Sequence, residues 1–140
     1  MSVSAQETSV GESRDMVLFE DLSRTQIVMY AGASGDYNPL HTDERYSTEV
    51  AGFPGVFAHG MLSMGATGRL ITDWFGVDRV IDFSARFVNQ VWPGDRLSAT
   101  CTVEAIREQD GEHVADLALI TVNGDEKPVV VGAATVRLDS

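Results

Sequence analysis

The second half of this 140-residue chain consists of segments in which apolar residues tend to occupy every second position. The segment Leu97–Ala105 is the clearest case, and three others follow the same rule: Phe83–Phe87, His113–Val122 and Val129–Leu138. This period places alternate side chains on opposite faces of a strand, so that one face can be buried. Turn signals separate the segments: Pro93-Gly94-Asp95, Asp110-Gly111 and Asn123-Gly124-Asp125. Connections this short predict an antiparallel meander of at least four strands, because parallel strands require long crossovers.

A segment of helical character precedes these strands. Residues Gly60–Phe75 are mostly apolar or small, with few charges, which is typical of a buried helix. The small residues Gly65, Ala66 and Gly68 indicate a surface that another backbone approaches closely, because glycine lowers helix propensity without such a reason. We therefore predict an α+β fold in which an antiparallel sheet wraps around a long central helix.

The first half of the chain alternates between helix and loop. Ser23 and Gln26 form a capping-box pattern, which predicts a helix from about Arg24 to Ala33. Gly, Asn and Pro then predict a loop over residues 34–42. A short helix with an acidic cap is expected over Asp43–Val50.

Length and composition predict one domain at residues 16–140, preceded by a disordered tail at residues 1–15 that is rich in Ser, Glu and Gly. No apolar stretch approaches the roughly 20 residues that span a bilayer, and the start of the chain lacks the pattern of a secretory signal. The single cysteine, Cys101, excludes an intramolecular disulfide and is expected in the core. These features predict a cytoplasmic protein that does not bind membranes.

The charge balance argues against nucleic-acid binding. The chain carries 21 acidic and 10 basic side chains, a formal net charge of -11, whereas phosphate backbones are bound by clustered Lys and Arg. A local patch could still hold phosphate groups, and the candidates are Arg69, Arg79, Arg86 and Arg96.

Two short segments carry residues suited to chemistry. In the predicted loop, Asp36 and His41 place a carboxylate and an imidazole five residues apart. Taken alone, this Asp-x-Asn-Pro pattern is more typical of a turn stabilised by its own side chains. At Ala58-His59-Gly60-Met61, the predicted buried helix begins with a small residue, and the free backbone N–H groups of a helix N-terminus can bind an oxyanion. Taken alone, this segment is more often an ordinary helix start.

Together, the two segments resemble a known signature. YAGASGDYNPLH at residues 30–41 and AHGML at residues 58–62 are similar to the motifs of MaoC-like dehydratases and R-specific enoyl-thioester hydratases. The resemblance extends over about Ser23 to Leu138, through Arg86-Phe87 and the Pro93-Gly94-Asp95 turn. It is closest to single-domain (3R)-hydroxyacyl-thioester dehydratase subunits of actinobacterial type. The resemblance implies the hot-dog fold, which agrees with the helix and sheet predicted above.

The resemblance also implies an activity, the reversible hydration of 2-enoyl thioesters to (3R)-3-hydroxyacyl thioesters of coenzyme A or acyl carrier protein. Such a hydro-lyase needs a base, an acid and a group that stabilises the enolate-like thioester oxygen. By resemblance, Asp36 and His41 share the acid–base work, and the Gly60 backbone N–H holds the thioester carbonyl. No cofactor is implied.

Other residues receive less definite roles from the resemblance. Asn38 is expected to shape the loop or orient the water, and Tyr37 to border the pocket or simply to flank the turn. Some hydratases carry a serine eight residues after the motif glycine, where this chain has Gly68, so Ser63 is a candidate for the missing hydrogen bond. Only Met16–Asp21 is available for the first strand of the family.

Several alternatives remain open at this stage. A hot-dog acyl thioesterase would use a base or nucleophile to deliver water to the carbonyl carbon, and the paired motifs do not point to that reaction. An acyl-binding subunit of a dehydratase heterodimer would need no acid–base pair, so the presence of both Asp36 and His41 favours an active chain. A homodimer, or a heterodimer with a related hot-dog chain, is expected. His59 is expected to be structural or to cap its helix, and one Asp, one Asn and one His do not form a recognised metal site.

Overall fold

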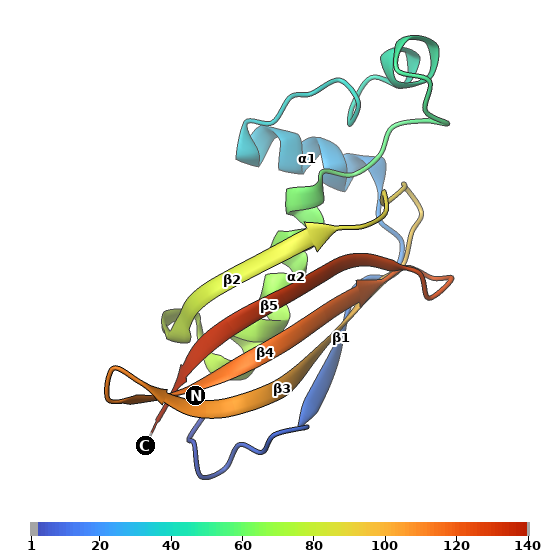
Figure 1. Ribbon diagram of the computed structural model, residues 1–140. Coiled ribbons are helices and arrows are strands. Elements are labelled where there is room, and N and C mark those ends of the chain that lie inside the picture. The colour runs from blue at the N-terminus through green and yellow to red at the C-terminus, as the bar shows by residue number, and fades with distance from the viewer. Residues whose placement is uncertain (1–2, 140) are drawn as a thin grey trace.

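A five-stranded antiparallel sheet dominates the computed structural model, which describes residues 3–139. Its strands are β1 (Ser13–Phe19), β2 (Val80–Phe87), β3 (Leu97–Gln109), β4 (Glu112–Val122) and β5 (Pro128–Leu138). Their order in space is β1-β3-β4-β5-β2 (Figure 1). The predicted meander is confirmed for β3-β4-β5 only. The fourth predicted strand, β2, pairs with β5 instead of with β3, so β1 and β2 form the two edges of the sheet.

The long helix α2 (Gly60–Phe75) has the predicted bounds and lies across one face of the curved sheet (Figure 1). It packs against residues of β1, β2, β3 and β5. Its side chains Leu70, Ile71, Trp74 and Phe75 are each no more than 2% exposed, and they join the main apolar core. Among the described residues, no helix is both long enough and apolar enough to cross a membrane.

The inner face of β3 completes this core. Leu97, Ala99, Cys101 and Val103 are each at most 1% exposed, whereas the residues between them are partly accessible. The predicted alternation is confirmed, and the Cys101 side chain lies in the core as expected. Burial raises the pKa of the Cys101 thiol to about 12, because a thiolate is poorly solvated among apolar side chains.

The glycines of α2 differ in what surrounds them. A Cβ atom at Gly68 would lie 3.2 Å from Cε2 of Phe83 in β2, whereas one at Gly65 would have no neighbour within 4 Å. The expected close approach is therefore present at Gly68, where a side chain rather than a backbone makes it. It is absent at Gly65, which is exposed.

The helical segments before α2 follow the sequence signals. Helix α1 (Arg24–Ser34) begins with the predicted capping box, in which Ser23 Oγ accepts from the Gln26 N–H at 3.1 Å and the Gln26 side chain accepts from the Ser23 N–H at 3.0 Å. The second predicted helix is a short turn whose regular part, η1 (Tyr46–Val50), is π-helical. Asp43 supplies its acidic cap by accepting from the Tyr46 N–H at 3.1 Å. A 3-10 turn, η2 (Val77–Arg79), links α2 to β2.

The N-terminal segment differs from the expected tail. Strand β1 begins at Ser13, three residues before the expected boundary, and pairs with β3. Its polar residues have specific partners: Thr100 donates to the Asp15 carboxylate at 2.7 Å, and the Arg14 guanidinium lies 4.6 Å from the Trp74 ring centre. Polar composition therefore predicted disorder incorrectly at residues 13–15, because backbone pairing with β3 and the contacts of Arg14 and Asp15 stabilise this strand. Residues 3–12 also hydrogen-bond to Val103 and Asp139, and residues 1 and 2 lie outside the described part.

Candidate active site

The loop after α1 and the first turn of α2 meet beyond one end of the sheet (Figure 1). Here Asp36, His41 and His59 each offer a ligand-type oxygen or nitrogen atom, and these three atoms all lie within 4.8 Å of one another. The structure thus brings together Asp36 and His41, as the loop pattern predicted, and places them beside the residue that precedes Gly60.

The loop is held by side chains that bond its own backbone. Asp36 Oδ1 accepts from the Asn38 N–H at 3.2 Å, and Asn38 Oδ1 accepts from the Leu40 N–H at 3.1 Å. The loop therefore contains both the self-stabilised turn and the Asp36–His41 pair that the sequence predicted. The two are compatible because the turns direct the chain so that His41 returns towards Asp36. One Asp36 oxygen is engaged in the turn, and the exposed side chain leaves its other oxygen accessible. Of the two roles predicted for Asn38, shaping the loop is the one that its side-chain oxygen performs.

One hydrogen bond determines how the His41 ring is protonated. His41 Nδ1 lies 2.6 Å from the Phe57 carbonyl oxygen. A carbonyl oxygen only accepts, so Nδ1 carries the hydrogen and Nε2 presents the lone pair when the ring is neutral. The Phe57 ring also contacts His41 edge-on, with centroids 5.3 Å apart. The site therefore holds His41 in the tautomer that can accept a proton at Nε2.

His59 lies beneath this pair and is only 1% exposed. Its ring stacks on His41 with centroids 3.9 Å apart, and its Nε2 donates to the Asp36 backbone carbonyl at 3.0 Å. Burial lowers the pKa of the His59 imidazole, and the hydrogen bond to Asp36 partly opposes this effect. His59 occupies the N-cap position of α2, but its side chain makes no capping hydrogen bond. This buried position fits the structural role predicted for His59. The alternative prediction, that the His59 side chain caps the helix, does not fit.

Gly60 begins α2 in a confined position. A Cβ atom there would lie 2.7 Å from Cδ2 of Phe87, so a larger residue could not enter without moving that ring. The first N–H groups of a helix have no carbonyl partner within it and carry the positive end of the helix dipole. The site thus combines an imidazole lone pair, a carboxylate and donors suited to a developing oxyanion.

The remaining predicted site residues lie in contrasting environments. Tyr37 is 69% exposed, so it does not contribute a buried wall. Ser63 is 2% exposed, and its Oγ has no hydrogen-bond partner among the described residues. Because Ser63 follows His59 by one helical turn, the two side chains share a face of α2. The sequence did not reveal the Phe57 carbonyl as a site group, since every residue has a carbonyl and no side-chain pattern marks this one.

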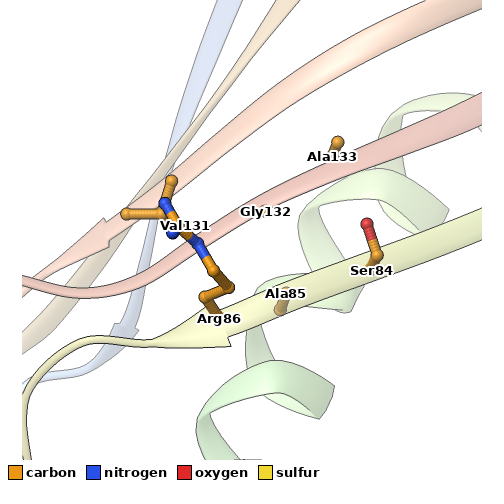
Figure 2. Close-up of a pocket in the computed structure, with 6 residues that line it drawn as sticks. All are labelled: Ser84, Ala85, Arg86, Val131, Gly132 and Ala133. Atoms are coloured by element: carbon orange, nitrogen blue, oxygen red, sulfur yellow. The ribbon is translucent and has the colours of Figure 1, made fainter.

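A separate depression lies between β2 and β5, and Figure 2 shows the residues that line it. Arg86 is its only charged residue, and the others are Ser84, Ala85, Val131, Gly132 and Ala133. It holds neither a carboxylate nor an imidazole, so it offers no acid–base chemistry. Of the four arginines considered for phosphate binding, Arg79 pairs with Asp139 at 2.8 Å and Arg96 with Glu20 at 3.1 Å.

Comparison with known proteins shows the family to which the chain belongs. A family model described as the MaoC-like domain matches residues 5–123. The chain therefore belongs to the MaoC-like domain family. The R-hydratase PhaJ1 from Pseudomonas aeruginosa, in its unliganded form, superposes with a TM-score of 0.85 at 24% identity, covering 99% of this chain and 88% of that one. This likeness confirms the hot-dog fold.

Two relatives have named activities. The chain is 33% identical over 107 residues to 3-hydroxyacyl-thioester dehydratase Y of Mycobacterium tuberculosis, covering 74% of this chain and 36% of that protein. It is also 33% identical over 131 residues to the (R)-specific enoyl-CoA hydratase of Rhodospirillum rubrum, covering 92% of this chain and 88% of that protein. The chain thus spans about a third of the first relative and most of the second.

Proposed function

We propose that this chain is a hydro-lyase that interconverts 2-enoyl thioesters and (3R)-3-hydroxyacyl thioesters. The observation that carries the proposal is the approach of the Asp36 carboxylate and the His41 imidazole within 4.8 Å, beside the N-terminus of α2. The names of both relatives, a thioester dehydratase and an enoyl-CoA hydratase, support the same reaction.

In the hydration direction, a water molecule would lie between Asp36 and His41. The Nε2 lone pair of His41 accepts a proton from this water, and the water oxygen forms a bond to C3 of the enoyl group. The electron pair of the double bond moves through C2 to the thioester oxygen, where the Gly60 N–H stabilises the resulting charge. The imidazolium then returns the proton to C2, so the net change is the addition of one water. Asp36 holds the water in place and stabilises the imidazolium.

The decisive experiment measures hydration by the purified chain alone. The substrate is a short 2-enoyl-coenzyme A, and the loss of ultraviolet absorbance of its conjugated double bond reports the reaction. Release of free thiol is measured in parallel, because a hot-dog thioesterase would produce thiol without first consuming the double bond. Thiol release without hydration would reject the proposal, as would the absence of hydration with both short and long acyl chains. The same assay with enoyl groups on acyl carrier protein distinguishes the two carriers.

A second hot-dog chain is expected to pair with this one in the cytoplasm. Strand β2 is an edge strand, and Ile81, Phe87 and Val88 at or just beyond it are 42–49% exposed. Exposed strand edges readily pair with another chain. Light scattering of the purified protein should give twice the 15.2 kDa chain mass for a homodimer. A stable monomer that gains activity only with a related chain would favour the heterodimer.

We expect the reaction to be independent of metal ions. Asp36, His41 and His59 form a group that could hold an ion, and the hydrogen bonds of His41 Nδ1 and His59 Nε2 to carbonyl oxygens leave each imidazole one free nitrogen. The proposed steps, however, use the free nitrogen of His41 as the base and draw on no metal ion. Dialysis against EDTA should leave kcat unchanged. A loss of activity that a divalent cation restores would instead identify this group as a metal site.

A further inference from the structure

The proposed mechanism uses three groups of the site but assigns no role to His59, the most buried of its polar side chains. Burying an imidazole is costly unless its nitrogen atoms are satisfied. In the described structure Nε2 has a partner, the Asp36 carbonyl, whereas Nδ1 has none. If His59 only filled space, an apolar side chain of similar size could do so without the free-energy cost of burying a nitrogen that lacks a hydrogen-bond partner.

The contact from Nε2 fixes the Asp36 backbone. Because the Asp36 carbonyl can only accept, His59 must carry its hydrogen on Nε2, which leaves Nδ1 unprotonated in the neutral ring. The hydrogen bond of 3.0 Å joins the loop to the residue directly before Gly60. His59 therefore links the two elements of the site: its side chain holds the backbone of Asp36, and its own peptide bond leads to the Gly60 N–H.

The stacked contact fixes the second acid–base group. The His59 and His41 rings lie 3.9 Å apart with an interplanar angle of 26°, and Tyr30 of α1 contacts His59 edge-on at 4.8 Å. Two imidazolium cations could not share this stack without strong repulsion. Burial and the proximity of His41 both lower the pKa of His59, whereas its hydrogen bond to Asp36 raises it. The neutral His59 ring thus leaves His41 as the partner that can take up a proton.

We infer that His59 is a positioning residue for the proposed reaction: it holds the Asp36 loop by its Nε2–H, supports the His41 ring by stacking, and keeps both aligned with the Gly60 N–H. The inference rests on the proposed hydratase function. It assigns a catalytic purpose to the histidine of the His-Gly-Met segment, without direct contact between His59 and substrate.

Two substitutions separate the two contacts. His59→Gln keeps an N–H donor for the Asp36 carbonyl but removes the aromatic ring, whereas His59→Phe keeps a ring against His41 but removes the donor. Because misplacement of a catalytic group by about 1 Å can cost 10²-fold in rate, we expect each variant to lose about 10- to 100-fold in kcat. The KM for the enoyl thioester should change by much less.

The His59 variants need a control that loses a similar amount of stability through a substitution outside this site. Thr121 is fully buried in β4 and shares a 2.6 Å hydrogen bond with Thr67 of α2. Thr121→Val removes this bond, so it should lower Tm while kcat per folded molecule stays at the wild-type value. Histidine variants that lose activity only in proportion to their unfolded fraction, as this control would, overturn the inference.

Two further outcomes are decisive. In ¹⁵N-histidine NMR spectra of the wild type, His59 should remain neutral, with Nε2 protonated, to a pH well below the ordinary histidine value of about 6.5. Titration of His59 at or above that value overturns the inference. An inactive wild type rejects the proposed function together with this inference, whereas an active wild type with unimpaired His59 variants rejects the inference alone.

Discussion

Replacement of His41 by Gln, or of Asp36 by Asn, is expected to lower kcat for enoyl-thioester hydration by about 10²- to 10⁴-fold, the usual contribution of a positioned acid or base. Gln at position 41 has no basic nitrogen to take the proton that Nε2 accepts. Asn at position 36 keeps the size of the side chain but replaces a charged oxygen with an amide. Initial rates with a short 2-enoyl-coenzyme A measure the effect, and thermal melting verifies that each variant is folded.

Matched changes elsewhere show whether the loss is specific. His113→Gln and Asp125→Asn alter the same residue types near turns of the β3-β4-β5 meander, so both should keep wild-type rates. If Asp36 and His41 act on one water, the double variant should be little slower than the slower single variant, because groups that act as a unit are not additive. Fully additive losses would contradict joint action, and near-normal rates in either single variant would remove that residue from the mechanism.

The second large effect is expected at Gly60. A methyl group there would meet the Phe87 ring at 2.7–3.0 Å, so Gly60→Ala must displace either the ring or the first turn of α2. The backbone N–H is retained, but loss of alignment of one oxyanion donor costs about 10²- to 10³-fold in kcat. Gly65→Ala is the matched control in the same helix, because its Cβ would meet nothing within 4 Å. That change should preserve activity and raise stability by about 0.5–1 kcal/mol.

A second substitution tests the steric explanation directly. Phe87→Ala removes the ring that excludes a Cβ at position 60, so the Gly60→Ala/Phe87→Ala protein should be at least tenfold faster than Gly60→Ala alone. Such a coupling between contacting positions appears as non-additivity in a double-mutant cycle. If the second change gives no recovery, the loss in Gly60→Ala has another cause. If Gly60→Ala has wild-type kcat, the Gly60 N–H is not the donor that stabilises the thioester oxygen.

Much of the fold could be predicted because burial and periodicity coincide in this chain. The alternation over β3 matches the buried side chains of the sheet, and the bounds of α2 follow from its apolar content. The capping box at Ser23 fixed the start of α1. The start of β1 was not predictable in the same way, because Ser13, Arg14 and Asp15 are polar residues whose strand is stabilised by pairing with β3. Such pairing depends on residues distant in sequence.

The site was predictable in its residues but not in its internal contacts. The two motif segments identified Asp36, His41 and Gly60, and the structure brings these segments together. Their catalytic roles remain predictions. The hydrogen bond from His41 to the Phe57 carbonyl and the stacking of His59 had no recognisable signal. Both depend on ring orientation and on the path of the backbone, which residue types and spacing do not specify.

The single thiol of the chain, on the inner face of β3, can report when the core opens. Cys101 is 0% exposed, and burial raises its pKa to about 12, so an alkylating reagent cannot attack it in the closed state. Modification then requires an opening that separates the inner face of β3 from the core packed over it, and its rate reports the free energy of that opening. Every variant above can therefore be compared for local and global opening without a substrate, a label or an added probe residue.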